Sequence, residues 1–340
     1  MTSMGSAPAA VLAIDGGNSK TDVVLVGHDG ALLASVRGPG SPVDGLRFET
    51  SKVVLEDLVT AAARQAGIDP AGQIAEHTSA FIAGADLPQE EQRLTEELAT
   101  RHWSPSIRAG NDTFAVLRAG TLRPWGVGVT CGAGINCVGV APSGELTRFL
   151  ALGRFTGDWG GGLDMGVEVM WWATRAEDGR GEPTVLSQAV ADYFGRATSA
   201  EVAIGIHLGE LDSDDLIRLT YVLFEVAQAG DPVAVRLVDR LAEEISVMAL
   251  VAMRRLRLTG LDTELALGGG LLMARNPLLI DGVTRRVLAE VPAARIRVVD
   301  VPPIAGAALL GLDHLGLDQA AHDRLREAYT SADSAIQAAG

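Results

Sequence analysis

The first forty residues carry three short apolar runs that are separated by turn residues. The runs cover residues 11–15, 20–27 and 31–36, with a glycine-rich turn between the first two and an Asp-Gly pair before the third. Asp-Gly and glycine-rich turns between apolar runs of this length are typical of β-hairpins. The pattern predicts three antiparallel strands that begin at Val11, after a flexible tail over residues 1–10.

After these strands, apolar positions recur with helical spacing and are interrupted by short buried strands. Trp171 and Trp172 lie on one of the predicted helices beside Met170 and are expected to pack in the core. The predicted helices cover residues 46–66, 88–102, a segment from Thr113, 163–175, 184–194, 213–229, 232–256 and 304–316, and the predicted strands cover 79–85, 106–110, 264–270 and 295–300.

The opening pattern of strand, glycine turn, strand, hairpin and strand occurs again over residues 126–150. Gly17 and Gly30 are 13 residues apart in the first copy, and Gly132 and Gly144 are 12 apart in the second. The recurrence predicts a duplicated α/β protein with two lobes and a cleft between them. The alternative is that any two antiparallel meanders look alike. The expected organisation is a tail over 1–10, a first lobe over 11–117, a second lobe over 118–316 and a helical segment over 317–340 that packs on the first lobe.

Composition and charge narrow the possible partners. The 28 Lys and Arg residues against 43 Asp and Glu residues give a net charge of −15, and only two of the basic residues are lysines. Nucleic acid is therefore not an expected partner. The chain has no run of 18 apolar residues, so no membrane span is expected. Two cysteines, Cys131 and Cys137, favour a reducing cytoplasm, and a homodimer is compatible with the sequence.

The first glycine turn carries groups that suit a phosphate. In the segment DGGNSKTD, Asp15 ends a strand and two glycines allow a ligand to approach the backbone closely. Backbone N–H groups and hydroxyls of such a turn bind phosphate oxygens, and Asp15 is a candidate for holding hydrated Mg²⁺. The alternative is a hairpin turn whose glycines serve geometry only. The spacing is not that of a Walker A loop.

Two later glycine segments strengthen this interpretation. The segment CGAGIN over residues 131–136 occupies the matching turn of the second half, and two such turns together suit one polyphosphate. The glycines at 268–270 lie between a predicted strand and a predicted helix, where a nucleotide would pass close to the backbone. A tight connection between strand and helix is an equally good explanation of this third segment.

Two aspartates are candidates for chemistry on a hydroxyl substrate. Asp112 follows a strand and precedes a helix, so it is either a helix N-cap or a base that accepts the proton of an attacking hydroxyl, or both. Asp158 lies among glycines before a helix and suits hydrogen bonds to sugar hydroxyls, although it too is a candidate cap. The six histidines show no metal-ligand spacing.

Six motifs in a fixed order resemble the N-acetylglucosamine kinase and BadF/BadG ATPase family of the actin, hexokinase and Hsp70 superfamily. They are DGGNSKTD, the aspartate after SIRAGN, CGAGIN, GDWGGG, the segment from Val226 to Ile245, and ELALGGG. The resemblance covers residues 11–316 and implies two RNase H-like lobes of the actin-like ATPase fold, with ATP and Mg²⁺ in a central nucleotide cleft. It implies phosphate binding by Gly16, Gly17, Asn18, Ser19, Lys20, Thr21, Gly132, Ala133 and Gly134, nucleotide near Gly269 and Gly270, Asp112 as base, and Asn136 and Asp158 on the sugar.

Two departures from the family pattern bear on the acceptor sugar. N-acetylglucosamine kinases carry GDEG where this chain has Trp159 after Asp158, and they offer an asparagine near the position of Asp44. The chain, glycine-rich and with arginine in place of most lysine, also looks similar to actinobacterial glucosamine kinases. A carboxylate suits a protonated amine, so the expected reaction is phosphorylation of D-glucosamine at O6. The alternative is that Asp44 caps the following helix and Trp159 packs in the core.

Three classes of function compete at this point. An amino-sugar kinase, for glucosamine or alternatively for N-acetylglucosamine, uses all the motifs. A BadF-type activator ATPase needs well-separated cysteines for an iron–sulfur cluster, whereas Cys131 and Cys137 lie in one hairpin. A non-enzymatic sugar sensor of related families carries an N-terminal helix-turn-helix, for which a first strand at Val11 leaves no room. The sequence therefore favours the kinase.

Overall fold

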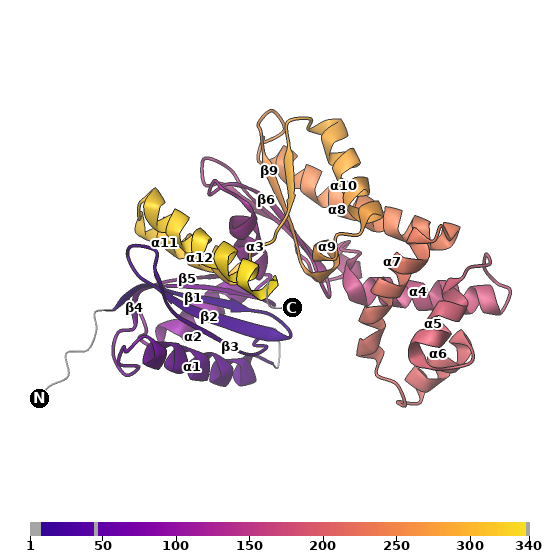
Figure 1. Cartoon of the computed structure of the whole chain (residues 1–340), viewed down its shortest axis with the longest axis horizontal. Coiled ribbons are helices and arrows are strands. Elements are labelled where there is room, and N and C mark those ends of the chain that lie inside the picture. The colour runs from indigo at the N-terminus through magenta and orange to yellow at the C-terminus, as the bar shows by residue number, and fades with distance from the viewer. Residues whose placement is uncertain (1–7, 44–46, 338–340) are drawn as a thin grey trace, which may run out of the picture. The chain divides into compact units, whose positions relative to one another are not determined.

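The computed structural model describes residues 8–43 and 47–337. The chain divides into two compact units (Figure 1). Unit 1 comprises residues 1–128, 142–144 and 299–340, and unit 2 comprises residues 129–141 and 145–298. No helix within the described ranges is both long and apolar enough to cross a membrane.

Unit 1 is built on a five-stranded sheet in the order β3-β2-β1-β4-β5. The first three strands form an antiparallel meander, and β4 and β5 continue the sheet in parallel with β1. Side chains of β1 alternate between the two faces, as the twofold period of a strand requires. The strands are β1 (Ala9–Gly16), β2 (Lys20–Val26), β3 (Leu32–Pro39), β4 (Ala75–Ile82) and β5 (Ser106–Gly110).

Helices cover both faces of this sheet. Leu12 and Ile14 belong to a buried apolar cluster with α1 and α2, whereas Val11 packs closely against Gly311 of α11 on the other face. Figure 1 shows α1 on one side of the sheet and α11 on the other. The helices are α1 (Phe48–Gln65), α2 (Pro88–Ala99), α3 (Asp112–Gly120), α11 (Pro303–Leu315) and α12 (Gln319–Gln337).

Unit 2 repeats the same sheet topology. Its sheet has the order β10-β9-β6-β7-β8, so a meander of three strands is again followed by two strands added beside its first strand. This match supports the duplication that the recurring glycine turns predict. The strands are β6 (Gly126–Cys131), β7 (Ile135–Val140), β8 (Leu146–Arg148), β9 (Glu264–Gly268) and β10 (Arg295–Val298).

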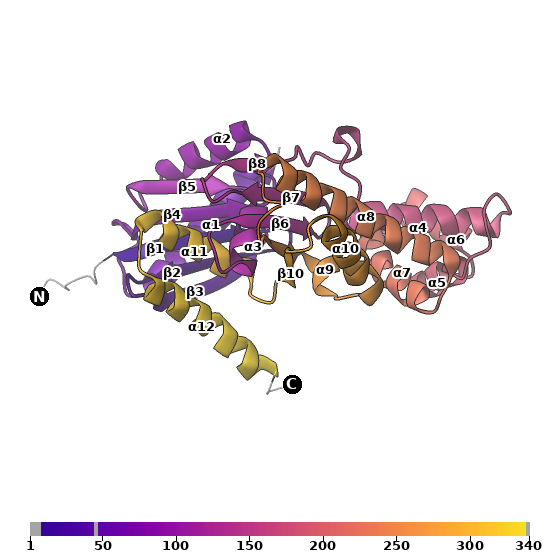
Figure 2. The same ribbon diagram turned by 90° about the horizontal axis from the view of Figure 1, so that it is seen from above.

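Unit 2 differs from unit 1 in its large helical part. The long helix α8 packs against β7, α10 and α7, and α4 to α7 form a helical group beside it, which is seen from above in Figure 2. The elements are the 3-10 helices η2 (Arg154–Thr156) and η3 (Ser213–Arg218), and the helices α4 (Gly161–Glu177), α5 (Leu186–Phe194), α6 (Ser199–His207), α7 (Leu219–Gln228), α8 (Pro232–Arg255), α9 (Gly270–Met273) and α10 (Pro277–Glu290).

Several sequence-based boundaries are wrong. The strand β1 begins at Ala9, which is buried, so the end of the expected tail belongs to the sheet. The helix expected over 213–229 is split into η3 and α7, and α6 has no predicted counterpart. Trp171 is 47% exposed and is not a core residue, because its side of α4 lines a cavity.

The helix α11 was expected in the second lobe and belongs to unit 1 instead. It is rich in small residues, and these allow its backbone to approach α3 and β1 closely. A Cβ at Gly306 would lie 1.8 Å from the carbonyl oxygen of Ala115, and the hydroxyl of Ser79 donates to the carbonyl of Ala307 at 2.6 Å. The apolar pattern identifies such a helix but does not say which sheet it covers.

Candidate active site

The first glycine turn joins β1 to β2 in unit 1. The N–H of Gly17 donates to the carbonyl of Lys20 at 2.8 Å, and residues 18–20 are exposed. The segment after β3 packs against this turn. The N–H of Ser41 donates to the carbonyl of Gly17 at 3.1 Å, and a Cβ at Gly40 would lie 2.2 Å from the carbonyl oxygen of Asn18. The turn is therefore held in one conformation and presents its outer side to solvent.

Thr21 takes a different position from the rest of this turn. Its side chain is fully buried, and its hydroxyl lies 2.7 Å from that of Ser41. Sequence reasoning missed Ser41, which contacts both Gly17 and Thr21. Because the Thr21 hydroxyl is engaged inside the protein, the exposed residues 18–20 are the better candidates for direct contact with phosphate.

Asp15 lies near the end of β1 and is buried, with 8% of its surface exposed. No described residue forms a hydrogen bond or an ion pair with its carboxyl group. Burial, followed by the negative charges of Asp112 and Asp22, raises the pKa of Asp15 to about 8, and the positive charges of Lys20 and Arg37 offset this only in part. A carboxyl group in such a position lacks a positive partner, which a bound cation would supply.

The neighbouring carboxylate of Asp22, unlike that of Asp15, pairs with basic side chains. Arg37 donates two hydrogen bonds to it, at 2.6 and 3.1 Å, and the ammonium of Lys20 lies at 3.4 Å. Asp22 is thus neutralised by the protein itself. The buried hydroxyl of Tyr329 in α12 also responds to these carboxylates. Burial is the main cause that raises its pKa, and the negative charges of Asp22 and Asp15 raise it as well.

Asp112 is the first residue of α3 and is not its N-cap. The cap is Asn111, whose side chain accepts from the N–H of Thr113 at 2.9 Å and donates to Asp86 at 2.7 Å. Asn111 therefore already fills the capping role that would explain Asp112 without a part in chemistry. Burial raises the pKa of Asp112 to about 6, although hydrogen bonds at the start of the helix lower it.

The helix α3 is fixed at its other end by a buried ion pair. Arg118 is 4% exposed and donates to the two carboxylate oxygens of Asp313 at 2.7 and 3.1 Å. His322 of α12 lies 2.9 Å from the same carboxylate. Two C-terminal helices therefore hold the helix that carries Asp112, and sequence reasoning did not find this support.

In unit 2 the second glycine turn packs against the start of α4. The carbonyls of Gly132 and Ala133 accept from the N–H groups of Gly162 and Leu163 at 2.8 and 3.0 Å. A Cβ at Gly161, which has a φ of +80°, would lie 2.5 Å from the Cα of Gly134. The first N–H groups of α4 are therefore satisfied by the turn, which explains why this helix needs no side-chain cap.

The third glycine segment joins the same structure. Gly269 has a φ of +88°, and a Cβ there would lie 2.5 Å from the carbonyl oxygen of Cys131. Gly132 and Gly134, in contrast, face open space. We call the contact of residues 131–134, 160–163 and 268–270 the glycine junction. Tyr221 of α7 borders it, since its hydroxyl would lie 3.6 Å from a Cβ at Gly270.

Asp158 lies at the edge of the glycine junction. Thr156 donates to one of its carboxylate oxygens at 2.5 Å, and no described residue binds the other oxygen. Asp158 does not cap α4, whose N-cap is Gly160. Asn136, at the start of β7, accepts from the N–H of Cys137 at 2.7 Å. Asn136 lies two residues after the first segment of the glycine junction, and Asp158 lies two residues before the second.

Of Trp159 and Asp44, the two residues on which the choice of acceptor sugar depends, the structure describes Trp159. Trp159 is 7% exposed and packs inside unit 2, with the guanidinium of Arg240 at 3.8 Å from its ring centre. Its bulk is therefore absorbed by the core, as the alternative interpretation held. Asp44 lies outside the described residues. The segment before it is fixed, since the N–H of Val43 donates to the carbonyl of Ala83 at 2.9 Å, and the N-cap of α1 is Arg47.

No group of three or more His, Cys, Asp or Glu side chains within residues 8–43 and 47–337 has the arrangement of a metal cage. Mg²⁺ usually binds one or two carboxylates together with water and substrate phosphates, so a buried carboxyl group without a partner, such as Asp15, is the more informative feature. Cys131 and Cys137 are both buried, and burial raises the pKa of both thiols, that of Cys131 to about 12. Neither thiol is disposed to ionise.

Comparison with known proteins assigns the chain to a family. The BadF/BadG/BcrA/BcrD ATPase family model matches residues 12–311. An N-acetylmuramic acid/N-acetylglucosamine kinase of Clostridium acetobutylicum is 27% identical over 272 residues, which are 79% of this chain and 87% of that protein. A glucosamine kinase of Vibrio cholerae is 24% identical over 242 residues, which are 71% of this chain and 79% of that protein.

A solved structure supports the fold. The crystal structure described as a putative N-acetylglucosamine kinase from Chromobacterium violaceum superposes with a TM-score of 0.70 at 22% identity, and the match covers 89% of this chain and 99% of that one. At this identity the likeness concerns the fold, which is the two-lobed actin-like ATPase fold that the motifs predict.

Proposed function

Because this chain belongs to the BadF/BadG/BcrA/BcrD ATPase family, we propose that it is an ATP-dependent kinase that phosphorylates O6 of an amino sugar, with D-glucosamine as the preferred acceptor. The observation that carries the proposal is Asp112, a carboxyl group at the start of α3 whose cap position is filled by Asn111 and whose pKa burial raises to about 6. A carboxylate with such a pKa is suited to accept a proton at neutral pH.

Asp112 acts in this proposal as the general base. It accepts the proton of the O6 hydroxyl while that oxygen attacks the γ-phosphorus of ATP. The bond between the γ-phosphorus and the bridging oxygen breaks, and ADP leaves. Enzymes of this kind gain most of their rate from positioning and from neutralising the phosphates, so a base that is held rigidly matters as much as its pKa.

Asp15 is the proposed Mg²⁺ residue. Its carboxyl group is buried, has no partner among the described residues, and has a pKa that burial raises to about 8. A hard cation with oxygen ligands fits this environment, because it would stabilise the ionised form. When bound, the cation would neutralise charge on the transferred phosphoryl group. The role of Asp15 is to hold the cation, directly or through water, at the end of β1.

Each unit, taken by itself, has groups that suit a nucleotide. In unit 1 the exposed residues 18–20 offer backbone N–H groups to the phosphates. In unit 2 the open faces of Gly132 and Gly134 admit phosphate oxygens close to the backbone, and Gly269 and Gly270 border the nucleotide. Glycine is suited to these positions because any side chain would hold the ligand away.

The acceptor sugar is assigned to Asp158, Asn136 and Asp44. Asp158 keeps one carboxylate oxygen for sugar hydroxyls, while Thr156 holds the other. Asp44 follows a segment that is hydrogen-bonded to the phosphate turn and to the end of β4. A carboxylate there would form a charge-assisted hydrogen bond with a protonated amine, which contributes about 1.5 to 3 kcal/mol, or roughly 10- to 100-fold in selectivity.

N-acetylglucosamine is the second candidate acceptor. The burial of Trp159 removes the argument that this tryptophan reduces the room for an acetyl group. The Clostridium relative is named for N-acetylated sugars, whereas the Vibrio relative is named for glucosamine. The preference for glucosamine therefore depends on the charge of Asp44 alone.

The activator ATPase is a weaker candidate. Iron–sulfur clusters are bound by cysteine thiolates that reach the cluster. Cys131 and Cys137 are both buried, and burial raises the pKa of each thiol above its usual range. An absorbance scan of the purified protein tests this alternative, since a brown chromophore would overturn the kinase proposal.

The experiment that tests the proposal is a coupled ADP-release assay with glucosamine, N-acetylglucosamine, glucose and mannosamine. Glucosamine is expected to give the highest kcat/KM. Replacing Asp44 with Asn is expected to lower kcat/KM for glucosamine roughly 10- to 100-fold and to leave that for glucose nearly unchanged. Asp57→Asn, the same change at an exposed position of α1, serves as the control.

The outcomes separate the levels of the proposal. A higher kcat/KM for N-acetylglucosamine than for glucosamine would refute the acceptor and keep the kinase. Equal losses for every sugar in Asp44→Asn would show that this residue does not recognise the amine. ADP release that no sugar stimulates would refute the kinase itself.

A further inference from the structure

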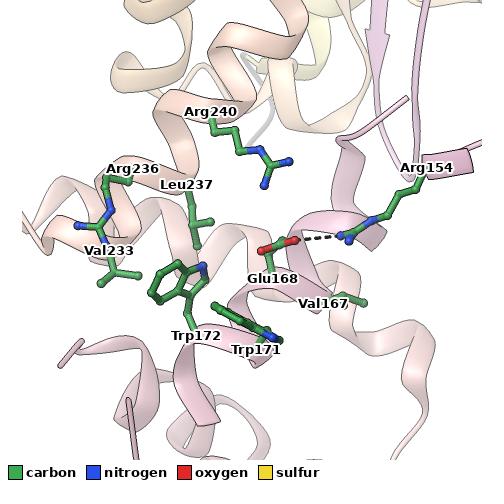
Figure 3. Close-up of a pocket in the computed structure, with 9 residues that line it drawn as sticks. All are labelled: Arg154, Val167, Glu168, Trp171, Trp172, Val233, Arg236, Leu237 and Arg240. Atoms are coloured by element: carbon green, nitrogen blue, oxygen red, sulfur yellow. Dashed lines mark hydrogen bonds and ion pairs between the residues drawn. The ribbon is translucent and has the colours of Figure 1, made fainter. Parts of the chain in front are cut away.

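A second binding site is indicated by a cavity in unit 2 that the proposed reaction does not use. The cavity has a volume of about 430 Å³ and lies between α4 and α8, with η2 at one end (Figure 3). Small-molecule sites typically measure about 300 to 1,000 Å³. Its lining includes Arg154, Glu168, Trp171, Trp172, Arg236 and Arg240.

Two tryptophans give this cavity an aromatic wall. Trp171 and Trp172 contact each other edge to face, with ring centres 4.9 Å apart, and Trp171 is 47% exposed. Val167, one turn earlier on α4, is 49% exposed. Large apolar side chains that stay in contact with water on one side of a cavity indicate a surface that a ligand or partner covers.

The arginines of the cavity are not equally neutralised. Arg154 pairs with Asp164 at 2.6 Å and with Glu168 at 3.1 Å, and Arg236 pairs with Glu182 at 2.8 Å. Arg240 has no carboxylate within ion-pair distance in the described ranges. Its guanidinium lies over the ring of Trp159, 3.8 Å from the ring centre.

Figure 3 shows Arg240 extending from α8 into the space above Glu168 and the tryptophans. Glu244 lies one turn further along α8. Burial raises the pKa of Glu244, and the positive charge of Arg240 lowers it in part. One guanidinium group is thus available in the cavity for an anion. A single available guanidinium matches one phosphate group better than a polyphosphate, because the carboxylate of Glu168 would repel further negative charge.

We propose that this cavity binds a monosaccharide phosphate. The phosphate would pair with Arg240, the C–H face of the sugar ring would lie on the exposed surface of Trp171, and Glu168 would accept from a sugar hydroxyl or amine. The two indole rings are nearly perpendicular, so they cannot stack on both faces of a flat base. This arrangement favours a saturated sugar ring over a nucleotide base. The choice of a sugar phosphate as ligand rests on the proposed function, because such a molecule is its product.

The same arginine connects the cavity to the proposed sugar-binding loop. The guanidinium of Arg240 lies 3.8 Å from the ring centre of Trp159, the residue after Asp158. The indole N–H of Trp159 is buried without a hydrogen-bond partner. A phosphate that draws Arg240 away would therefore remove a contact that holds this indole. Occupancy of the cavity is expected to raise the KM for the acceptor sugar.

The test is isothermal titration calorimetry with glucosamine 6-phosphate, inorganic phosphate, glucosamine and AMP as separate probes. The proposed catalytic site is first saturated with glucosamine and a non-hydrolysable ATP analogue. Glucosamine 6-phosphate is expected to bind once per chain and more tightly than inorganic phosphate. Arg240→Gln is expected to weaken this binding at least 10-fold, and Trp171→Leu is expected to weaken it for the sugar phosphate but not for inorganic phosphate.

Arg285→Gln, at an exposed position of α10, is the matched control and is expected to bind as the wild type does. Binding that Arg240→Gln leaves unchanged, or no saturable binding, would overturn the proposal. Tighter binding of AMP would refute the class of ligand. The two proposals fail separately: an active kinase without Arg240-dependent binding refutes the cavity site alone, and Arg240-dependent binding without sugar-stimulated ADP release refutes the kinase alone.

Discussion

The two units carry the same sheet topology but prepare their candidate sites by different means. In unit 1 the site consists of side chains, chiefly those of the buried Asp15 and the half-buried Asp112, whose pKa values desolvation raises. In unit 2 it consists of backbone, with three glycine segments packed so closely that a single Cβ at Gly161 or Gly269 would collide with a neighbouring chain segment.

This difference has a practical consequence. A buried carboxyl group without a partner costs stability, so replacing it should disturb function while sparing the fold. A backbone junction has no side chain to give way, so enlarging it should disturb the fold itself. Function and stability should therefore respond in opposite ways to substitutions in the two units.

The largest effect on stability is expected for Gly269→Ala. The substitution combines a positive φ with a Cβ placed 2.5 Å from the carbonyl oxygen of Cys131. Left-handed backbone and overpacking together should cost about 2 to 5 kcal/mol. Chemical denaturation measures this loss. Gly132→Ala, where the Cβ faces open space, is the matched control, and equal stability of the two variants would contradict the role of the glycine junction.

The next effect is a pH dependence that belongs to unit 1. His77 is buried, its ring stacks on that of His314 at 4.0 Å, and burial followed by the charges of His314 and Arg108 lowers its pKa from 6.5 to about 4. The neutral form is therefore favoured by folding. Its contribution is complete above pH 6.5 and is lost as the pH falls toward 4, by about 2 to 3 kcal/mol.

Thermal unfolding between pH 4 and 7 measures this dependence. His77→Phe keeps a ring at the position and is expected to flatten the curve over that range. A wild-type curve that is already flat between pH 6.5 and 4 would show that the histidine pair does not couple to folding.

The smallest effect is expected for Thr156→Val. Removing the hydrogen bond of 2.5 Å to Asp158 releases the proposed sugar-binding carboxylate, at a cost of about 1 to 2 kcal/mol. The KM for the acceptor should rise roughly 5- to 30-fold, with little change in kcat. Thr174→Val, whose hydroxyl bonds only to its own helix backbone, is the control. A fall in kcat at unchanged KM would argue against a positioning role.

The fold could be predicted from the sequence to a large extent, because hairpin turns and apolar periods are local signals. The duplicated meander, α8 and the cap at Asn276 all follow from such signals. The assignment of α11 to unit 1 could not be predicted, because it depends on the contact of Gly306 with Ala115, nearly two hundred residues away. The cavity wall at Trp171 was missed because exposure is set by neighbouring helices.

The sequence predicts candidate site residues where residue type and turn type coincide, as at Asp15 and in the glycine turns. What the sequence could not provide is the partner of each group. Asp22 and Asp15 look alike in the motif, yet Arg37 neutralises one and leaves the other without a partner. Ser41 likewise carries no local signal for its contact with Thr21.

The central claim is that Asp112 removes the proton from the acceptor hydroxyl, and Asp112→Asn tests it most directly. Steady-state turnover with glucosamine should fall by about 10²- to 10⁴-fold, while the melting temperature stays at or above that of the wild type, because a half-buried, desolvated carboxyl group is replaced by a neutral amide. Asp57→Asn should change neither value. A folded Asp112→Asn variant with turnover near that of the wild type would contradict the account.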